Sequence, residues 1–450
     1  MINPAELDVL RDALARLAEG CDALPDFTPE FDIESVSAVM HEVATRMHDN
    51  YPYYHPQYAG QMLKPPHPVA RLAYTLALWV NPNNHALDGG RASSAFEKEC
   101  VIELGEIFGW EKPLGHLTGG GTMANLEALW VAGRLRPGQK VIASDQAHYT
   151  HSRICEVLGI PFTAVRSTED GRMHMGHLEE LLGAGDVGTV VATIGNTGLG
   201  AVDPLAEILD LCSKHDVRIH ADAAYGGYFG LADELGREPR QAYDRLGEAE
   251  SIVIDPHKHG LQPYGCGCVL FRDPADGRFY KHESPYTYFS SGDLHLGEIS
   301  LECSRPGASA VALWATHRLL PPIKGGEFAR GLDNCLLAAR EFHKRLSTGT
   351  SFVPLMPPEL DIVVYTVRAP DTATATERAR SVFSLAAEND LHLALIELPA
   401  VLVGKYAQDM ELNSETVTCL RSVFMKPEHL EWLDPIVNIL EDAARRSKTA

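Results

Sequence analysis

Short apolar runs and helical stretches alternate along the middle of the chain. Between about residues 96 and 275, the apolar runs lie at 140–144, 189–193, 217–221, 251–255 and 267–271. Stretches with apolar residues at helical spacing lie at 95–108, 122–134 and 204–215. Strands that alternate with helices form a mostly parallel sheet with helices on both of its faces. The pattern therefore predicts a large α/β domain.

The order of elements changes after about residue 320. The predicted elements there are, in sequence, a helix at 328–346, strand-like runs at 360–367 and 416–423, and a last helix at 427–445. Helices and strands that do not alternate regularly are typical of an α+β unit. We therefore expect a smaller C-terminal α+β domain.

The N-terminal region differs from both. Four leucines follow helical spacing, which predicts an amphipathic helix: Leu7, Leu10, Leu14 and Leu17. Residues 51–60 are rich in tyrosine and proline and predict an ordered loop, because proline is excluded from helix interiors and central strands. The expected organisation is an N-terminal helix and arm (1–70), a large domain (71–320) and a C-terminal small domain (321–450).

Composition narrows the classes of protein. Of the 450 residues, 45% are apolar and 22% are charged, which is ordinary for a globular protein. The 39 basic and 61 acidic side chains leave a formal net charge of −22, which repels nucleic acid and anionic membranes. The chain shows neither a signal-peptide pattern nor an uncharged apolar stretch near 20 residues long. We expect a protein that is neither exported nor membrane-spanning and binds no nucleic acid.

The cysteines indicate a reducing compartment. There are nine, an odd number scattered along a long chain, which is not a disulfide framework. Only Cys266 and Cys268 are close, and alternation along a strand turns both to one face. Two such cysteines without a second ligand pair make a poor zinc site, so we expect core packing, no metal, and a cytoplasmic location.

Polar turns follow the predicted strands. Asp255-Pro256-His257-Lys258 follows one apolar run, and Asp222 ends another with Ala224 two residues on. A glycine-rich turn, His116-Leu117-Thr118-Gly119-Gly120-Gly121-Thr122, opens a predicted helix. His148 and Thr193 lie in or beside two further turns of this kind. Open α/β sheets hold ligands at the carboxyl ends of their strands.

Together these turns match the requirements of pyridoxal phosphate (PLP). This cofactor needs an anion site, a carboxylate for its ring nitrogen, flat groups against its ring and a lysine for its aldehyde. Glycines and a helix N-terminus suit the phosphate, Asp222 the ring nitrogen and Lys258 the aldehyde. Each motif alone also has a purely structural interpretation. Their agreement within one alternating domain favours the cofactor.

At these positions the chain resembles the PLP-dependent group II amino-acid decarboxylases, which have fold type I (aspartate aminotransferase-like). The similarity covers roughly residues 50 to 315, in the motifs HLTGGGTMANLEAL, SDQAHYTHSR, VATIGNTGLGAVDP, IHADAAYGGYF and SIVIDPHKHG. The resemblance implies that Lys258 forms an aldimine with the cofactor and Asp222 binds its ring nitrogen. His148 would stack on one ring face and Ala224 would pack on the other.

The same resemblance implies further contacts. Those to the phosphate would come from Gly120, Gly121, Thr122 and His257. Thr193 would lie near the ring substituents or the substrate carboxylate. The family resemblance and the N-terminal apolar stripe together predict a homodimer with its active site near the subunit interface.

The motif wording is most similar to tyrosine/aspartate decarboxylases, which implies an aromatic or acidic L-amino acid as substrate. Candidate substrate residues are His55, Asn81, Asn84, His85 and Arg305. For Arg305, which can hold a carboxylate with its bidentate fork, a structural pair with Glu302 is an open alternative. In the family, a loop tyrosine some thirty residues beyond the lysine donates a proton. Tyr286 and Tyr288 both qualify.

The resemblance thus implies a carboxy-lyase that releases an amine and CO2 through a quinonoid intermediate. The same cofactor frame also serves aminotransferases and carbon–carbon lyases, so fold cannot decide the reaction. A catalytically silent regulatory homologue is a further alternative, although Lys258, Asp222 and His148 are all present.

Overall fold

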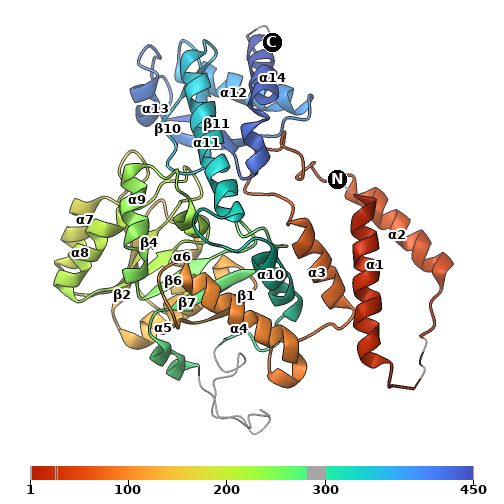
Figure 1. Ribbon diagram of the computed structural model, residues 1–450. Helices are drawn as coiled ribbons and strands as arrows, with labels where there is room; N and C mark the ends of the chain where they lie inside the picture. Colours follow the sequence, from red (N-terminus) through yellow and green to blue (C-terminus); the bar gives the residue numbers. More distant parts are fainter. Residues whose placement is uncertain (1–2, 26, 28, 281–299, 449–450) are drawn as a thin grey trace.

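The computed structural model describes residues 3–25, 27, 29–280 and 300–448. Within these residues the chain forms a seven-stranded and a four-stranded sheet. Figure 1 shows the helices and strands along the large body, with the C-terminal elements above it. The strands are β1 (Leu114–Thr118), β2 (Lys140–Ser144), β3 (Phe162–Val165), β4 (Val187–Thr193), β5 (Arg218–Asp222), β6 (Ser251–Ile254), β7 (Gly267–Phe271), β8 (Phe352–Pro354), β9 (Ile362–Val367), β10 (Ala394–Pro399) and β11 (Thr416–Val423).

Helices account for most of the remaining regular structure. They are α1 (Pro4–Ala18), α2 (Ile33–Met47), α3 (Pro68–Leu78), α4 (Arg91–Glu106), α5 (Gly121–Leu135), α6 (Thr150–Leu158), α7 (Met175–Leu182), α8 (Leu205–His215), α9 (Arg237–Asp244), α10 (Gly307–Leu319), α11 (Glu327–Thr348), α12 (Thr372–Ala387), α13 (Ala400–Tyr406) and α14 (Leu433–Arg446). Among the described residues, no helix combines the length and apolarity that a membrane crossing requires.

The large sheet has the strand order β1-β7-β6-β5-β4-β2-β3. Neighbours from β6 to β3 run parallel, whereas β7 is antiparallel to both β1 and β6. The prediction of a mostly parallel sheet is confirmed. All five predicted strands of this domain are present within two residues of their expected ends, and the sequence patterns missed β1 and β3.

Both faces of the large sheet are covered. On β2, Val141 and Ala143 pack in a cluster with Leu129 of α5, whereas Ile142 between them packs with Ile208 of α8. Successive side chains of a strand point to opposite faces. Helices α5 and α8 therefore lie on opposite faces, as in an α/β fold with two helical layers.

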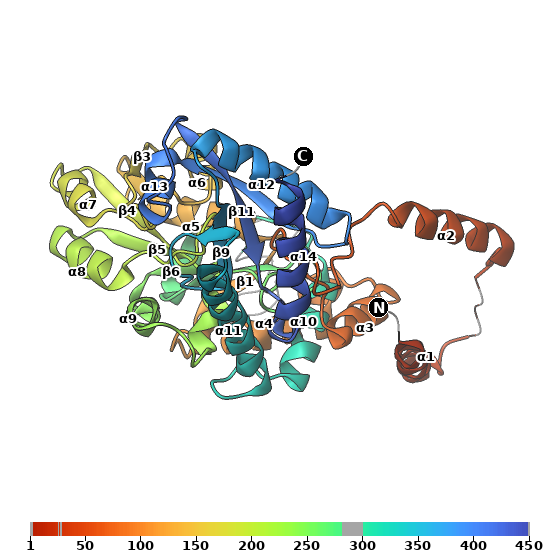
Figure 2. The ribbon, with the colours of Figure 1, turned by 90° about the horizontal axis from the view of Figure 1, so that it is seen from above.

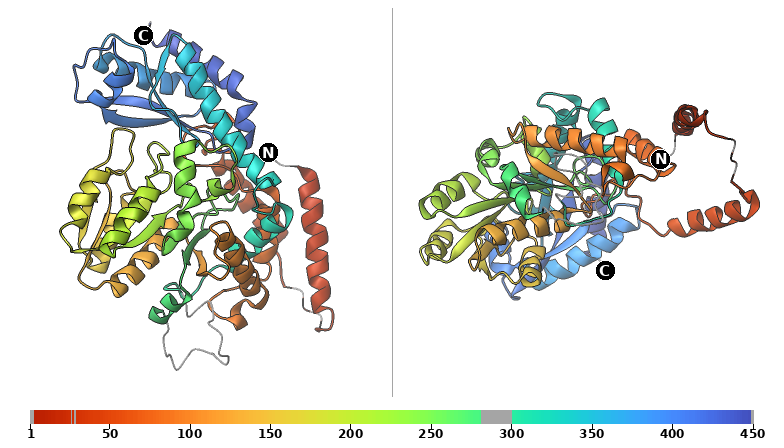
Figure 3. Two further views of the ribbon diagram at one scale, coloured as in Figure 1. Left: turned by 60° about the vertical axis from the view of Figure 1, so that its left-hand side comes forward. Right: turned by 90° about the horizontal axis from the view of Figure 1, so that it is seen from below.

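The C-terminal elements form their own sheet, in the order β10-β11-β9-β8 with antiparallel neighbours. A separate apolar cluster joins this sheet to α11, α12 and α14, with Phe342, Tyr365 and Phe424 among its largest buried side chains. Figure 3 shows this blue unit lying against the large domain. We propose the boundaries 1–70, 71–320 and 321–450 for the three parts of the chain.

The N-terminal arm contacts the body through α1 and residues 51–60, whereas α2 stands away from it. Helix α1 forms where the leucine spacing predicts it, and an Arg71–Glu6 ion pair connects it to α3. Helix α2 extends outward without a buried residue (Figure 2), and the leucine pattern did not predict it. Residues 51–60 form turns, as predicted, and Tyr58 forms a bridge with His392 of the small domain.

Candidate active site

The carboxyl ends of the central strands surround a cavity of about 530 Å³. Turns after β2, β4, β5 and β6 contribute to its wall, together with the N-terminus of α5. Nine residues predicted from the sequence line it: Gly120, Gly121, Thr122, His148, Thr193, Asp222, Ala224, His257 and Lys258. Parallel strands end at one sheet edge, which is why segments so far apart in sequence meet here.

The glycine turn between β1 and α5 forms one end of the cavity. Gly120 has φ 145°, a conformation that L side chains rarely adopt. A Cβ on Gly121 would lie 2.7 Å from Asp255 Oδ2, so a side chain does not fit there. The Gly119 N–H donates to a Glu302 carboxylate oxygen at 3.2 Å. This turn thus already accommodates one anionic oxygen beside the free N–H groups of a helix N-terminus.

Asp222 ends β5 and is buried. Its Oδ2 lies 2.8 Å from His151 Nε2, and its Oδ1 accepts the Ala224 N–H at 3.2 Å. Burial alone would raise the pKa of Asp222, but the His151 hydrogen bond and the charges of His151 and Lys258 outweigh it and lower that pKa. The carboxylate is therefore ionised at neutral pH.

Lys258 lies in the turn after β6, where its N–H donates to the Asp255 carbonyl. Its Nζ is 3.2 Å from Asp255 Oδ2, and its side chain is 23% exposed. His257 beside it is held by its Nδ1, 2.8 Å from the Cys266 carbonyl, and by its ring against Tyr264. The Lys258 amine is thus accessible from the cavity yet positioned by a buried carboxylate.

Two further wall residues offer unused groups. The Thr193 hydroxyl is buried and has no hydrogen-bond partner among the described residues, although its N–H donates to Asp203. The His148 ring is half-buried, with Nδ1 2.8 Å from the Thr150 hydroxyl, and burial lowers its pKa. A neutral imidazole and an unpaired hydroxyl are suitable contacts for a polar aromatic ligand.

None of the five candidate substrate residues lines this cavity in the described part of the chain. His55 packs edge-on against Trp432 with ring centroids 4.7 Å apart. Asn81 is exposed with φ 51°, and His85 lies against Gly89. Asn84 is buried, and its amide donates to Glu97 at 2.5 Å.

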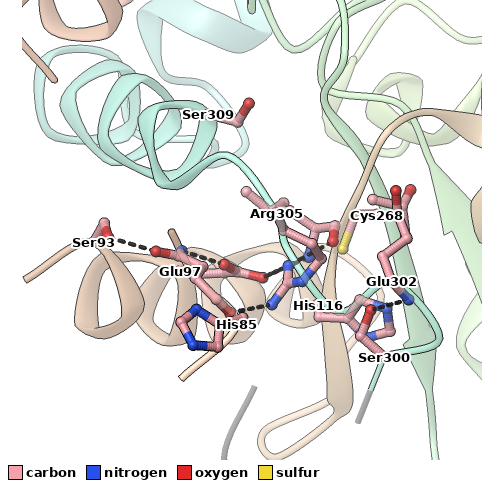
Figure 4. A network of polar contacts seen from close by, with 12 residues as sticks. His85, Ser93, Glu97, His116, Cys268, Ser300, Glu302, Arg305 and Ser309 are labelled. Atoms are coloured by element: carbon pink, nitrogen blue, oxygen red, sulfur yellow. Dashed lines mark hydrogen bonds and ion pairs between the residues drawn. The ribbon is translucent and has the colours of Figure 1, made fainter. Parts of the chain in front are cut away.

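Arg305 corrects a prediction. Its guanidinium does not pair with Glu302: its Nη1 lies 2.5 Å from Glu97 Oε1 and also donates to the Leu117 carbonyl (Figure 4). Both side chains are almost fully buried. Arg305 therefore forms a structural ion pair. Its partner, Glu97 of α4, is distant in sequence, and folding brings the two side chains together.

Tyr286 and Tyr288 lie outside the described residues. The buried pair Cys266 and Cys268 is free, as expected for core residues, and all nine cysteines are unpaired.

The sequence patterns missed two residues near the site. His151, three positions after His148, holds Asp222, and its place in the motif SDQAHYTHSR was a usable signal. Arg421 is buried in β11, with its guanidinium donating to the carbonyls of Thr197 and Gly198. A lone charge in an otherwise uncharged strand was the signal there, and Thr197 belongs to the cavity wall.

A mostly parallel sheet with a lysine, an aspartate and a glycine turn at its strand ends defines a fold type I PLP enzyme. The family model described as "Pyridoxal-dependent decarboxylase conserved domain" matches residues 130–368. The chain belongs to this decarboxylase family, and its cofactor is pyridoxal 5′-phosphate.

Two curated relatives indicate the range of the family. A probable L-tyrosine/L-aspartate decarboxylase of Methanothermobacter thermautotrophicus is 30% identical over 312 residues, which are 68% of this chain and 82% of that protein. An L-aspartate/L-glutamate decarboxylase of Pyrococcus horikoshii is 28% identical over 309 residues, covering 68% and 78%.

Solved structures agree with the fold. Mouse CSAD superposes with a TM-score of 0.78 at 20% identity, over 98% of this chain and 99% of that one. Oryza sativa TDC with PLP and tryptamine gives a TM-score of 0.80 at 16% identity, over 99% of each chain.

The cavity fits the cofactor on its own geometry. The glycine turn leaves room for a phosphate, the ionised Asp222 suits a protonated ring nitrogen, and the unpartnered Thr193 hydroxyl is available to a polar substituent.

Proposed function

We propose that the chain decarboxylates an L-amino acid, aromatic or acidic, and releases the amine and CO2. The observation that carries this proposal is the meeting of Lys258, Asp222 and the glycine turn in one cavity of a family member. When bound, PLP supplies an electron sink for the bond that breaks. The protein residues bind, orient and exclude water around that bond.

Each wall residue has a proposed role. Lys258 provides the amine that links to the cofactor aldehyde, with Asp255 holding its Nζ. Asp222 keeps a negative charge opposite the ring nitrogen, and His151 keeps Asp222 ionised. His148 and Ala224 pack on the two ring faces, and Gly120, Gly121, Thr122 and His257 bind the phosphate. Thr193 contacts a ring substituent or the substrate carboxylate.

Arg421 is the residue proposed to bind the carboxylate of the substrate. It has no ion-pair partner among the described residues, and its remaining contact is the side-chain oxygen of Gln61 at 3.2 Å. Burial lowers its pKa, and the charges of nearby groups, Asp361 among them, act in the opposite direction without forming an ion pair with it. A guanidinium with free donors beside the cavity wall suits a carboxylate in a bidentate pair.

We also propose a homodimer. Helix α2 exposes Ile33, Val36, Val39, Met40 and Met47, and a stripe of this kind on an isolated arm calls for a covering surface. A second copy of the chain offers the same stripe by symmetry. The unpaired cysteines support the cytoplasm as the location of this enzyme.

A panel of L-amino acids tests the activity. Holoenzyme is incubated with aspartate, glutamate, tyrosine and cysteine sulfinate, and CO2, amine and keto acid are measured. We expect CO2 and amine in equal amounts with one of them, and none with Lys258→Ala. Keto acid as the main product would instead indicate an aminotransferase, and a chain that never binds the cofactor would indicate a silent homologue.

A further inference from the structure

A second cavity, of about 490 Å³, lies behind the turn that carries Lys258. Its wall combines the loop at 64–67, the segment at 259–261, the start of α11 and the short helix η7 (Pro427–Leu430). It shares no lining residue with the active-site cavity, although His259 directly follows Lys258. The proposed reaction assigns this second cavity no role.

Lys64 supplies a cation to this cavity. Its ammonium makes one hydrogen bond, to the Met425 carbonyl at 3.3 Å, and no ion pair among the described residues. An ammonium has three donors, so two remain. Burial lowers the pKa of Lys64, while the charges of Asp361 and Glu428 act in the opposite direction without forming an ion pair with it.

A second lysine that forms no ion pair with the described residues lies close to the first. Lys426 is 4% exposed, its Nζ donates to the Tyr58 carbonyl at 2.7 Å, and it too has no ion pair in the described chain. Burial and the neighbouring charge of Lys64 lower its pKa to about 7. Two desolvated cations that repel one another favour an anion between or beside them.

A buried histidine adds an unused polar group. His259 is 1% exposed, lines the cavity, and has no hydrogen-bond partner for its Nδ1 within the described residues. Its Nε2 lies 3.2 Å from Asp361 Oδ2, and burial lowers the pKa of His259, so the single N–H of the neutral ring is directed at that carboxylate. Nδ1 is then a hydrogen-bond acceptor, which suits the P–OH of a hydrogen phosphate ion.

The acidic residues of this cavity are at its exposed rim. Glu327 and Glu428 are solvent-exposed, as is Arg330 beside them, whereas Lys64 and His259 are the more buried wall residues. We propose that the cavity binds a small oxyanion, a phosphate or a carboxylate, against the ammonium of Lys64.

Binding there would act on the catalytic lysine. The His67 N–H donates to the Leu261 carbonyl at 2.9 Å, which joins the Lys64 loop to the segment after Lys258. An anion that holds Lys64 and His259 together stabilises this joint and hence the turn of Lys258. The site is therefore placed to respond to an anionic metabolite without occupying the active site.

Inorganic phosphate is the probe. Holoenzyme saturated with PLP, whose own phosphate fills the active-site cradle, is titrated calorimetrically at constant ionic strength kept with sodium chloride. We expect one saturable phosphate site per chain. Lys64→Met should weaken the affinity at least tenfold, Arg330→Gln should weaken it less, and Glu327→Gln should tighten it by removing a repelling carboxylate.

Lys344→Met is the matched control, because Lys344 is an exposed lysine of the same helix α11 and lies outside this cavity. It should leave phosphate binding unchanged. If wild-type holoenzyme shows no saturable binding, or Lys64→Met and Arg330→Gln bind phosphate as tightly as wild type, the proposal is wrong. Binding that appears only without PLP would mark the active-site cradle and would equally overturn it.

Discussion

His151 Nε2 lies 2.8 Å from the Oδ2 of Asp222, and both side chains are buried. Asp222 would contact the cofactor ring, whereas His151 acts only through Asp222. This pair shows that the charge at the centre of the site is maintained from a neighbouring helix, α6.

Replacing His151 by leucine should raise the pKa of Asp222, because the hydrogen bond that helps to lower it is lost. The lowered pKa of Asp222 contributes stability at pH values above the unfolded value of 3.8, and this contribution disappears as the pH falls through the folded value. We expect His151→Leu to cost the apoenzyme about 1–3 kcal/mol at pH 7, with the difference narrowing below about pH 4. Urea unfolding at several pH values measures it.

His215→Leu is the control for this experiment, since His215 is an exposed histidine at the end of α8. It should change the free energy of unfolding by no more than about 0.5 kcal/mol. A loss in His151→Leu that stays the same from pH 7 to pH 3 would show that the pair does not act through the ionisation of Asp222.

Arg421→Met should raise KM and lower kcat/KM by about a hundredfold or more, because a buried charged pair with the substrate carboxylate is lost. The affinity for PLP should stay near the wild-type value, since Arg421 contacts Gln61, Thr197 and Gly198 and none of the residues proposed to bind the cofactor. Arg421→Lys keeps the charge without the fork and should lie between the two. Equal kcat/KM in all three proteins would contradict the role.

Glu97→Gln should destabilise the fold by about 3–5 kcal/mol, because it leaves the guanidinium of Arg305 buried without its counter-charge. Arg445→Gln removes a solvent-exposed pair with Asp442 and serves as the comparison, with a cost of about 1 kcal/mol or less. Thermal and urea unfolding measure both. If Glu97→Gln has normal stability and a raised KM, Arg305 binds the substrate and its structural role is wrong.

Tyr286→Phe or Tyr288→Phe should reduce amine formation and increase carbonyl by-product, if the affected tyrosine is the proton donor that the family resemblance implies. Product analysis by mass spectrometry distinguishes the two tyrosines. Normal amine yield without by-product in both variants, and in the double variant, would exclude a donor at these positions.

The sequence predicted the strands of the large domain well because their apolar runs are short, β-branched and buried on both faces. It predicted β1 and β3 poorly. β1 (Leu114–Thr118) merges into the glycine turn, and β3 (Phe162–Val165) is a short edge strand. It also missed α2, although Ile33, Val36, Met40 and Met47 follow helical spacing there.

The substrate residues show a different limit. Asn84 and Arg305 have side chains that often bind ligands. The sequence alone leaves open whether they contact a substrate or pair with other residues of the protein. Folding brings both to Glu97, where hydrogen bonds satisfy them. Arg421, by contrast, was overlooked within an otherwise uncharged strand and has no ion-pair partner in the described chain.

By itself, the sequence predicted the α/β class, the cofactor and nine of the residues that line the cavity, because each of those nine residues ends or follows a strand or lies where a helix begins, in a recognisable local pattern. The tertiary structure alone decided which charges are paired. Glu97 with Arg305 and His151 with Asp222 are pairs between distant segments, and Arg421 and Lys64 have no ion-pair partner among the residues that the structure describes. The free energy of a buried charge is set by the groups around it, and no local pattern of residues specifies those groups.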